Sequence, residues 1–176
     1  MRSKGFEGMR CSIADVLGAL GDRWSILIVR DLLLGLSRYD EFQSSTGVTN
    51  ATLSDRLKLL EKNGLIERRR YQTKPDRYEY VLTEMGKDVA LVVQALAQVG
   101  DKWNLAELAG PPLKFVNGRT GEPVKLVPMD EASGLPVLAQ DLRLEPGEGA
   151  DDIMRWRLAL KSSASGPTPE SSEASS

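Results

Sequence analysis

The sequence predicts a mainly α-helical (α+β) fold, on three observations. Apolar residues recur at helical spacing through most of the chain up to Trp103. This spacing changes to alternation in two short stretches after Gly64, which is typical of a β-hairpin. The 176 residues have room for one ordinary domain and an appendage, and a 41% apolar content is enough to form its core.

The composition excludes several classes of chemistry. The chain has no histidine, so it cannot form a Ser-His-Asp or Cys-His nucleophile pair. Its one cysteine, Cys11, cannot form an internal disulfide or a thiolate metal cage. Residues 1–9 show no secretory signal, and the apolar stretch 24–36 is interrupted by Arg30-Asp31 and too short to span a membrane. We therefore expect a cytoplasmic protein that is not an enzyme and has no cofactor or metal.

Two helices are expected first. Residues 13–20 carry one apolar stripe that ends at Gly21. Asp22 can cap a second, strongly apolar helix that begins near Trp24 and is closed by Gly35.

Two more helices flank a glycine turn. A short helix over residues 38–44 precedes the break Thr46-Gly47. The next helix starts at Thr49 and ends at Asn63-Gly64, and one leucine returns on the same face at every turn: Leu53, Leu57 and Leu60.

The hairpin and a long helix follow. Residues 65–71 and 77–82 read as strands joined by the polar connection 72–76. Thr83 can cap a final apolar helix that runs to Trp103. This order of helices, turn, helix and hairpin predicts a winged helix-turn-helix domain, whose second motif helix enters the major groove of DNA.

The charge distribution agrees with a DNA-binding face. Residues 1–105 carry 16 Lys and Arg against 14 Asp and Glu, whereas residues 106–176 carry 7 against 11. The segment 56–77 alone has eight basic and three acidic residues. Such a run is often only a solvated surface, so its position on the predicted hairpin and helix decides its meaning.

The helix from Thr49 supplies the candidate base-reading residues. If its leucines face inward, the polar side presents Ala51, Ser54, Asp55, Lys58 and Lys62, and its first turn presents Thr49, Asn50 and Thr52. Asn50 suits an adenine edge, and Arg56 at the flank suits a phosphate contact. The alternatives are helix capping and solvation for the short polar residues, and a salt bridge to Glu61 or Asp55 for Arg56.

The predicted wing is also basic. Its candidate DNA contacts are Arg69, Arg70, Lys74 and Arg77. Arg69 and Arg70 could instead be charges that protect a strand edge from aggregation.

Successive motifs resemble the HxlR-type branch of the MarR-like winged-helix transcription regulators. The resemblance covers about residues 11–103. The motifs are Cys11-Ser-Ile-Ala, Leu20-Gly-Asp-Arg-Trp-Ser-Ile-Leu-Ile, Arg30-Asp-Leu-Leu-Leu-Gly, Arg38-Tyr-Asp-Glu-Phe, Leu53-Ser-Asp-Arg-Leu, Leu60-Glu-Lys-Asn-Gly-Leu-Ile-Glu-Arg and Tyr78-Glu-Tyr-Val-Leu-Thr-Glu-Met-Gly. The resemblance implies a homodimeric DNA-binding regulator, usually a repressor, whose first and last helices form the dimer interface.

On this interpretation the dimer residues are Ile13, Val16, Leu17, Val89, Val92, Val93, Leu96, Val99 and Trp103. A dimer predicts double-stranded DNA with a pseudo-palindromic operator as the partner. The alternative is that the last helix packs entirely within its own chain or beneath the C-terminal segment.

Cys11 is a candidate sensor of electrophiles or oxidants, because many proteins of the family that the chain resembles carry a responsive cysteine near this position. A helix start and the neighbouring Arg10 form a setting that favours a reactive thiolate. A small-molecule inducer would then act by modifying Cys11. An inert buried thiol is the alternative.

The predicted domains are an N-terminal arm 1–10, the winged-helix domain 11–109, a small β-rich extension 110–161 and a disordered tail 162–176. Residues 151–160 permit a helix or a strand. The extension could bind a ligand, cover the helices or only pad them. The alternative for the whole chain is a ligand- or protein-interaction module that keeps the winged helix without binding DNA.

Overall fold

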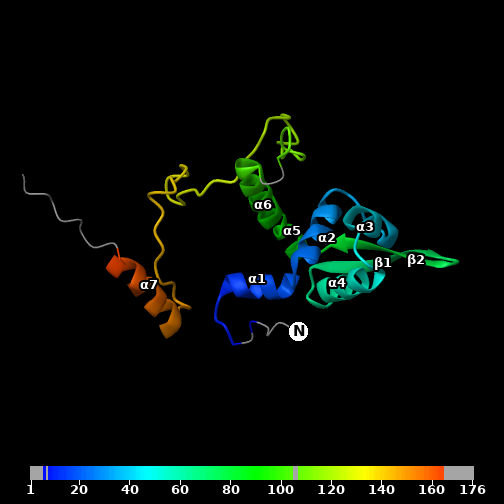
Figure 1. The fold of residues 1–176 in the computed structure, drawn as a ribbon, viewed down its shortest axis with the longest axis horizontal. Coiled ribbons are helices and arrows are strands. Elements are labelled where there is room, and N and C mark those ends of the chain that lie inside the picture. Colours follow the sequence, from blue (N-terminus) through cyan, green and yellow to red (C-terminus); the bar gives the residue numbers. More distant parts are fainter. Residues whose placement is uncertain (1–5, 7, 105–106, 165–176) are drawn as a thin grey trace, which may run out of the picture. The chain divides into compact units, whose positions relative to one another are not determined.

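The computed structural model describes Phe6, residues 8–104 and residues 107–164. The described residues divide into two compact units, one comprising Phe6, residues 11–104 and residues 107–127, and the other residues 8–10 and 128–164. The first unit contains the winged helix-turn-helix that the sequence predicts (Figure 1). Its elements are α1 (Ser12–Leu20), α2 (Arg23–Leu33), α3 (Tyr39–Thr46), α4 (Asn50–Lys62), β1 (Ile66–Thr73), β2 (Asp76–Leu82), α5 (Glu84–Asp88) and α6 (Ala90–Trp103).

Side-chain caps begin two of the helices, at Asp22, where the sequence predicts one, and at Thr49, where capping is the alternative to DNA reading. Asp22 Oδ1 accepts hydrogen bonds from the backbone N–H groups of Trp24 and Ser25, at 3.0 and 3.3 Å, and so caps α2. Thr49 Oγ1 accepts from the N–H of Thr52 at 3.3 Å and caps α4. The turn between α3 and α4 contains Gly47 at φ 68°, a backbone angle that other residues rarely adopt.

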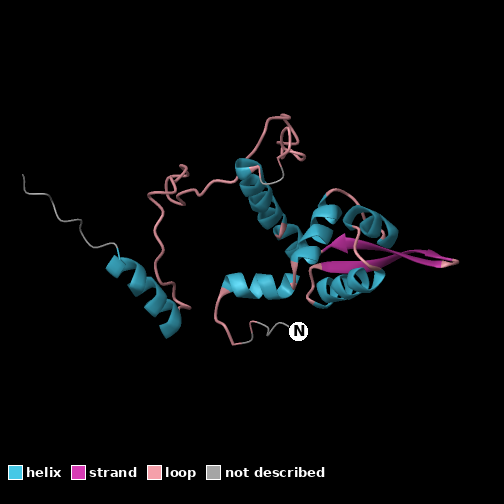
Figure 2. Ribbon diagram, viewed as in Figure 1, coloured by secondary structure: helices cyan, strands magenta, loops and turns pink. Residues whose placement is uncertain are grey.

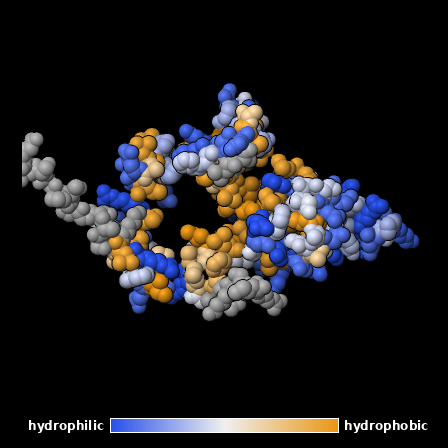
Figure 3. All heavy atoms as spheres, in the orientation of Figure 1, coloured by the Kyte–Doolittle hydropathy of each residue, from blue (hydrophilic) through white to orange (hydrophobic). Residues whose placement is uncertain are grey.

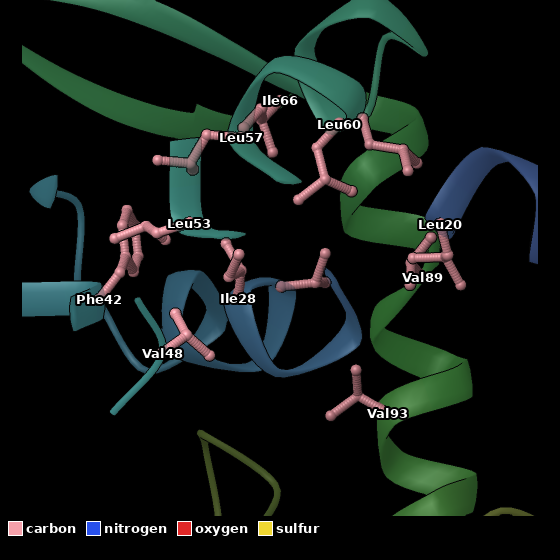
Figure 4. Close-up of a cluster of buried hydrophobic side chains, with 12 residues drawn as sticks. Leu20, Ile28, Phe42, Val48, Leu53, Leu57, Leu60, Ile66, Val89 and Val93 are labelled. Carbon is pink, nitrogen blue, oxygen red and sulfur yellow. The ribbon is translucent and has the colours of Figure 1, made fainter. Parts of the chain in front are cut away.

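The core is built around the inner face of α4. Leu53, Leu57 and Leu60 are at most 2% exposed and belong to one cluster with Ile28 of α2 and Phe42 of α3 (Figure 4). Burial of these side chains is the main driving force that holds the helices together. It also fixes which side of α4 remains in contact with solvent.

The hairpin is longer and its turn tighter than the sequence predicts. β1 and β2 pair antiparallel from Ile66↔Leu82 to Thr73↔Asp76, so only Lys74 and Pro75 form the turn. The register shifts between Arg70 and Gln72. Residues 72–76 have the polar composition of a loop, because strand ends that lie beyond the core need no apolar residues.

The expected single last helix is two helices, broken at Val89. Thr83 Oγ1 accepts from the N–H of Gly86 at 3.1 Å and caps α5. Gly86 lies so close to β1 that an added Cβ would be 2.0 Å from the carbonyl oxygen of Leu65. The apolar pattern is continuous over both helices. The helix breaks because α5 is held against the sheet whereas α6 leaves it.

The C-terminal segment forms fewer strands than expected. In its described part the only strand pairings are isolated bridges, Val116↔Pro123 and Met129↔Pro136. Proline lacks the N–H group that a ladder needs, and this limits each pairing to a bridge beside a turn. Residues 151–160, for which the sequence permits a helix or a strand, lie almost entirely in a helix, α7 (Asp152–Ala164), drawn in cyan in Figure 2. The predicted disordered tail begins at residue 162, but α7 continues through Ala164. The rest of the predicted tail, residues 165–176, lies outside the described residues.

We expect Gly86→Ala to lower the stability of the fold, because the new methyl group meets backbone atoms that cannot rotate away. The expected cost is about 1–3 kcal/mol or more, the usual range for overpacking, and thermal unfolding followed by circular dichroism measures it.

Gly18→Ala in α1 is the matched control. The nearest atom to its added Cβ is 3.8 Å away, in Phe6, and alanine favours a helix over glycine, so its melting temperature is expected to stay the same or rise. Equal melting temperatures for the two variants would contradict the packing at Gly86.

Candidate nucleic-acid interface

The face of α4 opposite its buried leucines carries most of the residues that the sequence predicts to contact DNA. Five of them are exposed and three are half-buried. The exposed residues are Thr49, Asn50, Ala51, Asp55 and Lys58, and the half-buried ones are Thr52, Ser54 and Arg56. The fold thus brings the polar first turn of α4 and its polar side onto one accessible surface.

Tyr39 of α3 fixes the start of α4. Its hydroxyl donates to the carbonyl oxygen of Asn50 at 2.8 Å and lies 3.0 Å from Ser54 Oγ. Ser54 is therefore shared between the candidate surface and the joint between the two helices. Sequence spacing places Tyr39 in a short helix but does not show where its hydroxyl goes.

Glu41 fixes the start of α3. Its Oε2 accepts from the backbone N–H groups of Ser37 at 2.8 Å and Arg38 at 2.9 Å. These two bonds hold the pKa of Glu41 below its ordinary value of 4.5, because they favour the ionised carboxylate. The motif that presents α4 is thus fastened at both of its helix starts.

Arg56 forms an ion pair that the sequence did not predict. Its Nε donates to Asp22 Oδ2 at 2.6 Å, and not to Glu61 or Asp55. Each of the two side chains is 31% exposed. The pair joins α4 to the residue that caps α2, 34 positions earlier in the chain.

The basic residues of the hairpin fall into two groups. Arg69 pairs with Glu67, and Arg70 lies 3.7 Å from Asp76, so part of their charge is neutralised within the wing. Lys74 and Arg77 are exposed at the tip, and no ion pair is recorded for either among the described residues. Figure 3 shows hydrophilic side chains over the whole protruding hairpin.

The predicted dimer residues do not all lie on one accessible face. Val89 and Val93 are only 6% and 8% exposed and belong to the chain's own core. They contact the core because α6 turns this side toward α2. The other predicted dimer residues remain exposed: Ile13, Val16, Leu17, Val92, Leu96, Val99 and Trp103. Leu91 is exposed as well. Figure 3 shows apolar side chains over α1 and α6.

Cys11 occupies the N-cap position of α1 and is half-exposed. Its side chain forms no capping hydrogen bond. Elsewhere in the described ranges, no cluster of three or more metal-ligating side chains occurs. No helix in those ranges is long and apolar enough to cross a membrane.

A helix held by a helix-turn-helix with its polar face outward, beside a basic hairpin, defines a winged helix-turn-helix DNA-binding transcription regulator. The profile of the HxlR-like helix-turn-helix family matches residues 19–107. The chain belongs to this family.

The similarity to known proteins extends beyond that region. An uncharacterized HTH-type transcriptional regulator of Mycobacterium tuberculosis is 35% identical over 144 residues, which cover 82% of this chain and 89% of the relative. The crystal structure of the candidate transcription factor PA1607 is 31% identical, with a TM-score of 0.70 over 81% of this chain and 99% of that one. A candidate transcription factor of Pseudomonas aeruginosa, PA1374, is 35% identical, with a TM-score of 0.57 over 84% of this chain and 100% of that one.

Proposed function

We propose that this protein is a dimeric, sequence-specific DNA-binding repressor that acts in the cytoplasm and has no enzymatic activity. The exposed polar turn of α4 beside the unpaired charges of the hairpin tip carries this proposal. In the proposed complex, the first turn and outer face of α4 enter the major groove. The hairpin follows the backbone or the adjacent minor groove, where cationic side chains are favoured.

Among the α4 residues, Asn50 is assigned to base reading. Its side chain is exposed at the first turn, and a bidentate contact to an adenine edge suits its amide. Thr49 caps the helix by accepting from the N–H of Thr52, and the hydroxyl oxygens of the two residues lie 3.0 Å apart. The first-turn N–H groups of Asn50 and Ala51 are left for a phosphate. Specificity and positioning thus come from neighbouring residues with separate tasks.

The proposed wing contacts are tested by replacing Lys74 and Arg77 together with alanine. Each lost phosphate contact lowers the slope of log affinity against log salt concentration by about 0.9, so the pair should lower it by about 1.8. Fluorescence anisotropy with duplexes selected from genomic fragments measures the slope.

The matched control replaces Lys125 and Arg119, an exposed lysine and arginine outside the winged helix, with alanine. We expect its slope to equal that of the unchanged protein. A chain that binds no duplex even at very low ionic strength would contradict DNA binding and favour a ligand- or protein-interaction module.

We propose that the exposed apolar residues of α1 and α6 form the dimer interface. A groove of about 590 Å³ between these helices is lined by Ile13, Val16, Leu17, Val92 and Leu96, and Phe6 also contributes to it. Exposure of such an apolar face to water is unfavourable in free energy, and a second copy of the chain would remove the face from solvent. The symmetry would place two copies of α4 at half-sites roughly 34–36 Å apart on a pseudo-palindromic operator.

Val99→Asp tests the interface. The valine is 56% exposed within one chain, so an aspartate there should leave the fold intact but place an unpaired charge in the dimer. We expect the dimer dissociation constant to rise by at least tenfold, measured by sedimentation velocity at micromolar concentrations. Leu34→Asp, at an exposed leucine outside α1 and α6, should leave it unchanged.

We propose Cys11 as the sensor of an electrophilic or oxidising inducer. It lies half-exposed at the start of α1, a proposed dimer helix, so an adduct there would alter the spacing of the two recognition helices. With no second cysteine, the modification is an adduct, a mixed disulfide with a small thiol or a bond between subunits.

We expect an electrophile such as a quinone to leave the DNA affinity of Cys11→Ser unchanged. The same electrophile should release the protein that keeps Cys11 from its operator in the same anisotropy assay. A serine variant that still releases DNA would contradict the sensing role. The inducer would then be sought in the apolar cavity of about 490 Å³ between α2 and α6.

A further inference from the structure

We infer that Asp22 is a positioning residue that aims Arg56 at a phosphate of the DNA backbone. This inference rests on the proposed function, because it names a residue that prepares the DNA-binding surface without touching DNA. It starts from the ion pair between the cap of α2 and the flank of the recognition helix.

Both carboxylate oxygens of Asp22 accept hydrogen bonds, and each binds a different partner. Oδ1 accepts from the N–H groups of Trp24 and Ser25 and caps α2, whereas Oδ2 accepts from Nε of Arg56 at 2.6 Å. Because the cap fixes the carboxylate to the helix start, the direction of Oδ2 is fixed as well. Arg56 is therefore held by a group that cannot follow it freely.

The corner that carries Asp22 is itself fastened to α4. Asn63 at the end of α4 donates from Nδ2 to the carbonyl oxygen of Ala19 at 2.8 Å. Gly21 has φ 84°, and a Cβ on it would be 2.3 Å from Cδ2 of Leu59 in α4. The chain between α1 and α2 thus lies directly against the recognition helix, and the positive φ of Gly21 favours glycine at this corner.

Arg56 keeps the donors that a phosphate needs. A guanidinium has five N–H donors, and only Nε is recorded in a bond within the described chain. The terminal groups Nη1 and Nη2 are those that pair with phosphate oxygens in a fork. Arg56 also shares a flank of α4 with Thr52, one turn earlier, which belongs to the polar first turn.

A pair with both side chains 31% exposed is partly screened by water, so its contribution to folding stability is modest. Orientation is a different effect. An arginine already held in one conformation loses less freedom when it binds phosphate, which strengthens binding. Asp22 should therefore increase DNA affinity although it adds a negative charge near the DNA.

Asp22→Asn separates these effects, since asparagine caps a helix as well as aspartate does but carries no charge. We expect DNA affinity to fall about tenfold and the salt slope to fall by about 0.9, because Arg56 loses its fixed direction and its phosphate contact. Arg56→Gln should show the same losses, and the double variant should be no weaker than either single variant. Anisotropy titrations at several salt concentrations measure all three.

Asp88→Asn is the control, because Asp88 is an exposed carboxylate after the hairpin and its loss changes the net charge equally. Removing a negative charge should leave affinity unchanged or raise it. Asp22→Ser, with another good capping residue, repeats the test if the asparagine variant folds poorly, and melting temperatures identify such a failure.

The inference is overturned if Asp22→Asn binds as the unchanged protein does, if it binds more tightly as expected for a competitor of phosphate, or if its loss adds to that of Arg56→Gln. An equal salt slope with a lowered melting temperature would also overturn it, as this indicates a structural pair only. These outcomes all require that the unchanged protein binds DNA. Failure of that protein to bind would instead contradict the proposed function.

Discussion

Burial of one leucine face of α4 is the constraint on which the candidate interface depends. Leu53, Leu57 and Leu60 are removed from water by Ile28 and Phe42, so the helix cannot rotate about its axis without exposing them. The opposite face is consequently presented to solvent. The same packing that stabilises the domain therefore also orients the surface proposed to read DNA.

Polar contacts refine the orientation that packing sets. Tyr39 bonds to the start of α4, Asn63 bonds from its end to Ala19, and Asp22 holds Arg56 between them. Each contact joins α4 to a different neighbour. The hydrogen bond from Asn63 to Ala19 thus connects α1, a helix of the proposed dimer face, to the recognition helix, so a displacement of α1 would act on α4.

Local signals predicted most of the fold and failed at particular residues. The caps at Asp22 and Thr83 and the leucine period of α4 need only neighbours in sequence, and each prediction is confirmed. Val89 and Val93, which the sequence predicts at the dimer interface, lie in the chain's own core, because a wide apolar face does not show which part another element covers. The C-terminal strands were overestimated, since alternation there does not ensure a ladder.

By itself, the sequence determined the order of helices and hairpin, the lack of histidine chemistry and the concentration of basic residues near the wing, because these depend on composition and local spacing. The tertiary structure alone decided the partner of Arg56, the bond from Tyr39 to α4 and the apolar residues left exposed on α6. These features join residues that lie 11 and 34 positions apart or depend on a neighbouring helix. Their geometry arises only when the core brings those elements together.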